Sequence, residues 1–226
     1  MAWGRGGGRA GTADNQQFGA DAGTPFGGSG NIYADFNDDT SGSGVSAQSA
    51  TYSVGNAVST FQFDFHEPSG GGNDGILFGF GTSAINSANA RARASLGGGS
   101  FGLLSDAGDT DNGVTYLFDT TYTIYMVFND TSSAVNYAGG TVAASTADIW
   151  IEDFGGGNLR LAGSAAVENS QAGSYRVAFR SFSNPQQRLY VDNVSLSEGA
   201  AAIPEPGSFA LLAGMFGLTW VMLRRR

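Results

Sequence analysis

Between about residues 30 and 197, apolar and polar side chains alternate in short runs. Phe61, Phe63 and Phe65 alternate with polar residues, and the segment 175–179 repeats the pattern. This period of two is typical of β-strands that bury one face. The run 122–128 is apolar on both faces, which indicates a central strand covered on each side.

The same pattern predicts further strands, separated by clusters of glycine, aspartate and asparagine. They cover residues 32–36, 45–54, 76–80, 90–96, 114–118, 147–154, 159–162 and 187–196. Before the C-terminal segment, no helical period extends beyond two turns. So many short strands within one domain, residues 29–198, predict an all-β sandwich of two antiparallel sheets.

The C-terminus differs from this pattern. After a short linker, 199–203, comes Pro204-Glu205-Pro206, then the charge-free run 207–223, and finally three arginines. As a helix the run would be about 25 Å long, close to the ~30 Å hydrocarbon core of a bilayer. Positive charge stays on the cytoplasmic side, so we expect a transmembrane helix over 207–223 with the rest of the chain outside.

A Pro-Glu-Pro motif, a short transmembrane helix and a terminal arginine cluster resemble the PEP-CTERM sorting signal of Gram-negative bacteria. The matching residues are Pro204, Glu205, Pro206, Arg224, Arg225 and Arg226. The resemblance implies export and anchoring in the inner membrane. An exosortase would then process the tail, and the body would pass to the cell surface or an extracellular polysaccharide matrix. A plain membrane anchor without processing is the alternative.

The N-terminus lacks the apolar stretch of a secretory signal peptide, although residues 1–11 contain two arginines. We therefore expect residues 1–28 to be a flexible lead-in that follows a mis-called or truncated start. Gly6, Gly8 and Gly11 fit the spacing of a dinucleotide-binding loop, but no strand precedes them.

The charge balance excludes some partners. The chain carries −9 and has no lysine and no cysteine; the tail from Pro204 contributes +2, so the rest carries −11. Phosphate backbones attract positive charge, so nucleic acid is not an expected partner. Without cysteine, neither disulfides nor thiolate metal sites form.

The body also resembles the concanavalin A-like, laminin-G-like jelly rolls. The matching features are an opening strand that runs into 35–39, the aromatic strand 61–65 and the closing segment 190–196. This resemblance implies a jelly roll, a fold that serves lectins, glucanases and structural modules alike.

One segment is a candidate for sugar chemistry. Asp148, Trp150 and Glu152 share one strand face, but four residues place the two acids about 13 Å apart. Glycosidase carboxylates lie closer than this, so the segment is typical of an ordinary strand with solvated acids. The alternatives are a sugar-stacking platform at Trp150 and, after it, a catalytic pair. His66, the only histidine, ends a strand on its polar side and supports no nucleophilic triad.

Calcium is the one cofactor that the sequence suggests. Asp35, Asn37 and Asp39 have the spacing of oxygen ligands, and Asp106, Asp109 and Asp111 form a second cluster in an expected loop. Acidic turn residues also shape turns by local hydrogen bonds, so neither cluster predicts a metal by itself.

These observations predict an exported, exosortase-processed structural or adhesion protein of the cell surface or exopolysaccharide matrix, without catalytic activity. One alternative is a lectin-like carbohydrate-binding module, with Trp150 stacking on sugar rings. Another is a divergent glycoside hydrolase of concanavalin A-like fold.

Overall fold

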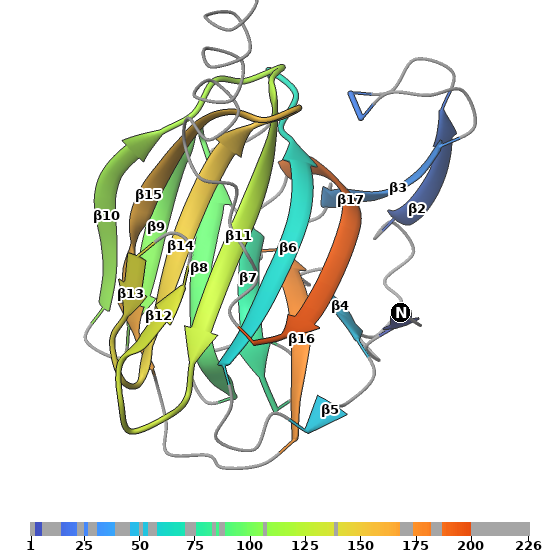
Figure 1. The fold of residues 1–226 in the computed structure, drawn as a ribbon. Coiled ribbons are helices and arrows are strands. Elements are labelled where there is room, and N and C mark those ends of the chain that lie inside the picture. Colours follow the sequence, from blue (N-terminus) through green and yellow to red (C-terminus); the bar gives the residue numbers. More distant parts are fainter. Residues whose placement is uncertain are drawn as a thin grey trace, which may run out of the picture.

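The computed structural model describes residues 3–5, 15–21, 25–26, 31–38, 46–49, 52–53, 58–70, 76–82, 85, 89–105, 108–137, 140–167, 174–181 and 187–199. In these ranges the regular structure is β-strand. Two antiparallel sheets face each other, which confirms the predicted all-β sandwich (Figure 1).

The predicted sorting signal lies outside the described residues. This applies to Pro204, Glu205, Pro206, the run 207–223 and Arg224 to Arg226. Across the described ranges, no helix combines the length and the apolar character needed to cross a membrane.

Sheet A contains eight strands in the order β1-β4-β16-β7-β8-β9-β10, with β5 paired to β16. Their bounds are β1 (Trp3–Arg5), β4 (Ser46–Ser49), β5 (Tyr52–Ser53), β7 (Ile76–Gly81), β8 (Ala90–Gly97), β9 (Ser100–Ser105), β10 (Gly108–Thr115) and β16 (Ser174–Ser181).

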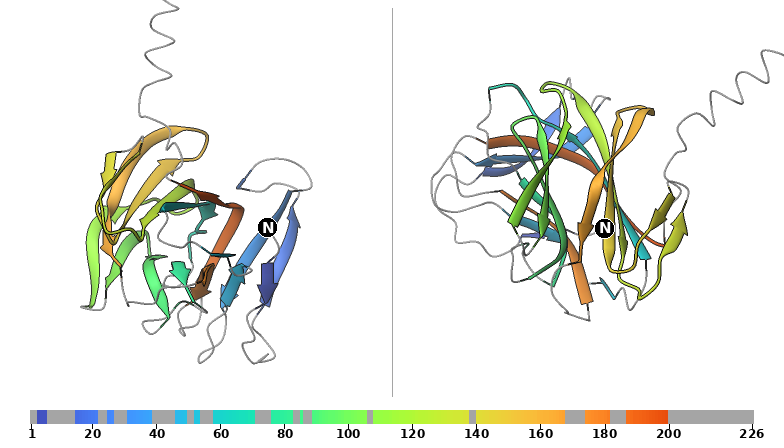
Figure 2. Two further views of the ribbon diagram at one scale, coloured as in Figure 1. Left: turned by 60° about the horizontal axis from the view of Figure 1, so that its bottom comes forward. Right: turned by 90° about the vertical axis from the view of Figure 1, so that its left-hand side faces the viewer.

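Sheet B contains seven strands in the order β15-β14-β11-β6-β17-β3-β2. Their bounds are β2 (Asn15–Asp21), β3 (Asn31–Asp38), β6 (Val58–His66), β11 (Thr121–Asn129), β14 (Thr146–Asp153), β15 (Gly157–Ala166) and β17 (Gln187–Glu198). A separate hairpin, β12 (Val135–Tyr137) and β13 (Gly140–Val142), lies beside β14, as Figure 2 also shows.

Aromatic rings fill the space between the sheets. Phe61, Phe63 and Phe65 are fully buried, as their alternation predicts. The ring of Phe63 meets that of Phe179 from sheet A edge to face, with 4.9 Å between centroids. On β8, Ala92 and Ala94 belong to this core, so their small side chains leave room for the rings. Burial of these rings supplies most of the driving force for folding, because the hydrophobic effect scales with buried apolar area.

Strand β11 is covered on both faces, as the sequence predicts. Ile124 and Met126 belong to the core between the sheets. On the other face, Tyr125 and Val127 pack with Val142 of the β12–β13 hairpin. The hairpin therefore covers part of the face of sheet B that is turned away from sheet A.

Several elements differ from the expectations. Residues 15–21, expected in the lead-in, form β2 and pair with β3. The strand expected over 114–118 begins earlier, at Gly108, because its polar residues 108–113 pair with β9. Backbone pairing to a neighbouring strand does not require apolar side chains, so the hydrophobic pattern missed both segments.

Candidate functional site

The candidate site lies on the outer face of sheet B, the face turned away from sheet A. Thr123 of β11 lies opposite Asp64 of β6 on one side and Glu152 of β14 on the other. Asp64 in turn lies opposite Asp192 of β17. Residues opposite each other in antiparallel strands share a face, so these four side chains form one row, here called the acidic row.

Asp64 is the most enclosed member of the acidic row, with 4% of its surface exposed. Thr123 Oγ1 donates a hydrogen bond of 2.5 Å to Oδ1, and Asn193 Nδ2 donates one of 2.7 Å to Oδ2. Burial raises the pKa of Asp64 and the charge of Asp192 adds to the rise, while the two hydrogen bonds oppose it.

A bulge in β17 brings Asn193 to this carboxylate. The pairing with β6 shifts by one residue between Asp192 and Ser195, and Asn193 has a φ of 49°. Bulges of this kind redirect side chains and are frequent next to functional sites. A left-handed backbone at a residue other than glycine costs free energy, which the bond to Asp64 offsets. Asn193 is thus an exposed amide anchored on a buried acid.

Tyr125 is hydrogen-bonded to one acid of the acidic row and lies within the electrostatic reach of another. Its hydroxyl donates a hydrogen bond of 2.7 Å to Oε2 of Glu152. Burial raises the pKa of Tyr125, and the charges of Glu152 and Asp64 raise it further. The phenol therefore stays protonated at neutral pH, within the electrostatic reach of both carboxylates.

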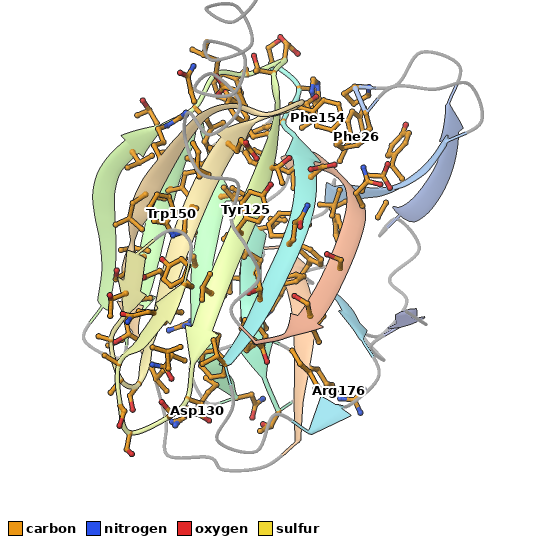
Figure 3. All side chains as sticks on the ribbon, viewed as in Figure 1. Phe26, Tyr125, Asp130, Trp150, Phe154 and Arg176 are labelled. Atoms are coloured by element: carbon orange, nitrogen blue, oxygen red, sulfur yellow. The ribbon has the colours of Figure 1, made fainter. Side chains whose placement is uncertain are left out.

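A second network lies on the same face beneath the hairpin. Tyr137 Oη donates to Oδ2 of Asp148 at 2.8 Å and accepts a bond of 2.8 Å from Nε1 of Trp150. Ser164 Oγ donates to the other oxygen of Asp148 at 2.5 Å. Figure 3 shows Trp150 and Tyr125 on the neighbouring strands β14 and β11. The indole N–H of Trp150 is therefore already hydrogen-bonded within the protein.

Aromatic rings continue the face toward β3. Tyr33 packs edge-on against Tyr190 with 4.9 Å between centroids. Tyr190 lies almost parallel to His66, at 5.9 Å and an interplanar angle of 13°. These three rings, here called the aromatic ladder, are half-buried, and Phe26 adjoins Tyr33 at 6.1 Å. Rings of this kind stack on the apolar faces of sugars.

The hydrogen bonds of His66 fix which ring nitrogen carries the proton. Thr121 Oγ1 donates its hydrogen to the carbonyl of Pro25 at 2.8 Å, and it lies 3.2 Å from His66 Nδ1. Nδ1 must therefore be the donor, which leaves Nε2 of the neutral ring as an acceptor. Burial lowers the pKa of His66 and so favours this neutral form.

The structure keeps Asp148, Trp150 and Glu152 on one face, as the sequence predicts, but pairs each acid with a different tyrosine. Sequence reasoning missed Asp64 and Asn193 as parts of the same site. The alternation 61–65 already placed Asp64 on the polar face, whereas the bulge that brings Asn193 to it leaves no signal in the sequence.

Four of the six residues expected to bind calcium lie in strands. Asp35 and Asn37 belong to strand β3, and Asp109 and Asp111 belong to strand β10. Asp39 and Asp106 lie outside the described residues. In the part of the chain that the structure describes, no three histidine or acidic side chains are grouped to hold a metal ion.

No protein-family model matches this sequence, and no curated protein matches it. Solved structures do resemble the sandwich. Lectin II from Ulex europaeus superposes with a TM-score of 0.52 at 10% identity, over 74% of this chain and 87% of the lectin. The endo-beta-1,4-glucuronan lyase from Trichoderma reesei gives a TM-score of 0.52 at 9% identity, over 87% of this chain and 94% of the lyase.

The fold is the concanavalin A-like jelly roll. A third similar structure is the catalytic domain of a glycoside hydrolase family 131 protein from Coprinopsis cinerea, with a TM-score of 0.50 and 13% identity. The match covers 78% of this chain and 75% of the Coprinopsis cinerea chain. These neighbours correct one expectation. The jelly roll is shared with a hydrolase and a lyase as well as with lectins, so the exclusion of catalysis does not stand.

Proposed function

We propose that this jelly roll binds polysaccharide on the outer face of sheet B. The observation that carries the proposal is the aromatic ladder beside the acidic row. Tyr190 and His66 offer ring surface. Two and three residues further along β17, Asp192 offers hydrogen-bond acceptors and the amide of Asn193 offers both a donor and an acceptor. A few placed polar groups beside aromatic surface are typical of sites that bind small polar ligands. The lectin fold supports the same proposal.

A binding assay tests this proposal. We expect full-length protein to be retained on insoluble polysaccharides, and Tyr190→Ala combined with His66→Ala to abolish retention. Phe118→Ala is the matched control, because it removes an aromatic ring that is 40% exposed in the β10–β11 loop and that lies against the β8–β9 turn at Gly99. Equal loss in the control and in the double variant would contradict the proposal.

We further propose that the chain is an exported surface or matrix component whose tail is an exosortase-processed sorting signal. The support is the order of Pro204-Glu205-Pro206, the apolar run and the terminal arginines. A helix formed by this charge-free run would present apolar side chains to lipid on every face. Moving the three terminal arginines across the bilayer would cost much free energy. A polysaccharide-binding body would then retain the released protein in the matrix.

The test of sorting uses an exosortase-bearing Gram-negative host and a signal peptide fused upstream. We expect mass spectrometry of the surface fraction to find protein that lacks Arg226. Changing residues 204–206 to alanine should leave an uncleaved, membrane-bound form. An intact Arg226 terminus on released wild-type protein would sink the sorting proposal.

Glycan cleavage is the second candidate, and one observation favours it. Asp64 and Glu152 lie two strands apart across β11, which places their backbones about 9.5 Å from each other. Side chains at this spacing fall near the ~6.5–9.5 Å separation of inverting glycosidases. Both acids are nearly buried, so cleavage requires the face to open before a glycosidic oxygen reaches them.

Release of new reducing ends from a bound polysaccharide measures cleavage directly. Glu152→Gln should stop the release while retention on the polysaccharide persists. If wild-type protein binds a polysaccharide and releases no ends, binding is its function.

A further inference from the structure

Phe154 directly follows β14, and 43% of its surface is exposed, which is a large fraction for an aromatic side chain. The backbone pairing of sheet B continues to this residue, because its amide nitrogen donates a hydrogen bond of 3.2 Å to the carbonyl oxygen of Thr121 on β11. Side chains alternate between the two faces of a strand, and Glu152 belongs to the outer face. Phe154, two residues later, therefore lies on the outer face as well.

The register of sheet B places Phe154 in line with the aromatic ladder. Tyr190 of β17 lies opposite His66 of β6, and His66 lies opposite Thr121 of β11. The hydroxyl of Thr121 lies 3.2 Å from Nδ1 of His66, while its backbone accepts the hydrogen bond from Phe154. Figure 3 shows Phe154 and Phe26 at the same end of the sheet. The row of side chains thus crosses four neighbouring strands, from β17 to β14.

The length of this row sets the size of the ligand that can cover it. Neighbouring strands lie about 4.8 Å apart, so the three steps from Tyr190 to Phe154 span about 14 Å. One pyranose ring cannot cover that distance. Between His66 and Phe154 lies the shorter side chain of Thr121, so rings alternate with a gap. In a β-1,4-linked chain, sugars two units apart present the same ring face, which suits this alternation.

The turn after Phe154 supplies no packing reason for the position of its ring. Gly155 and Gly156 follow it with φ of +89° and +93°, and a Cβ atom at Gly155 would face open space. A single exposed apolar side chain needs no explanation by itself. A ring in line with three half-buried rings is different, because together they form a continuous aromatic surface that a ligand can cover.

We propose that Phe154 is the fourth ring of the aromatic ladder, and that the site binds the interior of a linear β-1,4-linked glycan laid across the strands. This rests on the proposed polysaccharide binding. A path along β14 would instead lead from Phe154 past Glu152 to Trp150. The half-buried ring of Trp150 packs with the apolar cluster beneath the β12–β13 hairpin, which obstructs that path.

The test begins with columns of insoluble cellulose, chitin and mannan, which are all β-1,4-linked. Full-length protein is then titrated by calorimetry with the disaccharide and the hexasaccharide of a polysaccharide that retains it. We expect the hexasaccharide to bind at least about tenfold more tightly, because the row accommodates more than two sugars. Equal affinities, or retention on none of the three, would overturn the inference. Retention on no polysaccharide of any linkage would overturn the proposed function as well.

Variants locate the fourth ring. Phe154→Ala should weaken hexasaccharide binding about tenfold and leave disaccharide binding within about twofold, and Phe154→Trp should restore the difference. Phe118→Ala removes a ring of similar exposure that lies against the β8–β9 turn, and it should change neither affinity. If Phe154→Ala leaves hexasaccharide binding unchanged, or if Trp150→Ala removes the dependence on length instead, the glycan does not follow this row and the inference is wrong.

Discussion

The amide nitrogen of Asn193 donates a hydrogen bond of 2.7 Å to the buried carboxylate of Asp64, across 129 residues of sequence. The bond joins a bulge in β17 to the polar face of β6. It fixes an exposed amide in a left-handed backbone beside the aromatic ladder. The polar part of the proposed site is therefore held from beneath by a group that itself has little contact with solvent.

Removing this bond should destabilise the protein. Asn193→Ala leaves Oδ2 of Asp64 without that donor and keeps the left-handed φ, so we expect unfolding by urea to cost about 1–3 kcal/mol less free energy. Asn158→Ala is the control. Asn158 also has a positive φ and donates a bond of 2.7 Å to an aspartate, but at the exposed start of β15. Its substitution should cost less than about 1 kcal/mol, and equal losses would contradict the argument.

The pKa of Asp64 predicts how stability depends on pH. The pKa is raised above the ordinary value of 3.8, so the folded state binds the proton more tightly than the unfolded state. Stability contributed by this group is therefore present at low pH and is lost as pH rises from about 4 through the raised pKa. Asp64→Asn should lack this loss. The difference in unfolding free energy between the variant and wild type should shift in favour of the variant from pH 4 to pH 7, as urea titrations can measure.

A second buried acid joins the loops at one end of the sandwich. Glu67 is 1% exposed, accepts a hydrogen bond from Gly98 N at 3.1 Å, and accepts another from the hydroxyl of Tyr116. Tyr116→Phe removes the hydroxyl donor and should lower stability by about 1–3 kcal/mol in chemical denaturation. Thr141→Ala removes an exposed hydrogen bond of 2.8 Å to Asn136 and should change stability by no more than about 0.5 kcal/mol.

At Gly79, strand β7 closely approaches the backbone of β8 in sheet A. A Cβ atom at this position would lie 2.1 Å from the carbonyl oxygen of Ala92, and the φ is +149°. Gly79→Ala should therefore cost more than about 3 kcal/mol or prevent folding. Gly140 has nearly the same φ, +142°, with open space around it. Gly140→Ala then isolates the backbone strain, and a thermal melt that shows the same loss for both would disprove the steric argument.

The sequence predicts most of the sheet core because alternation reports burial. Phe61, Phe63 and Phe65 are buried as predicted, and the apolar run 122–128 is covered on both faces. Strands without apolar alternation, such as β2 and the first part of β10, are held by backbone pairing and so remain hidden in sequence.

The site is harder to predict because its members meet across strands. Asp148, Trp150 and Glu152 share a face within one strand, which periodicity shows. Asp64 joins Glu152 only through the register of β6, β11 and β14, and Asn193 joins Asp64 only through a bulge. Register depends on the packing of both sheets, and a search along one strand for paired carboxylates does not find this pair.

The most direct test of carbohydrate binding by the outer face of sheet B is hydrogen–deuterium exchange of the full-length protein with and without a soluble oligosaccharide of the polysaccharide that retains it. The account predicts slower exchange in peptides covering β6 (Val58–His66) and β17 (Gln187–Glu198), and no change in peptides covering β7 and β8 of sheet A. Protection confined to β7 and β8, or no protection at a saturating concentration of the oligosaccharide, would contradict it.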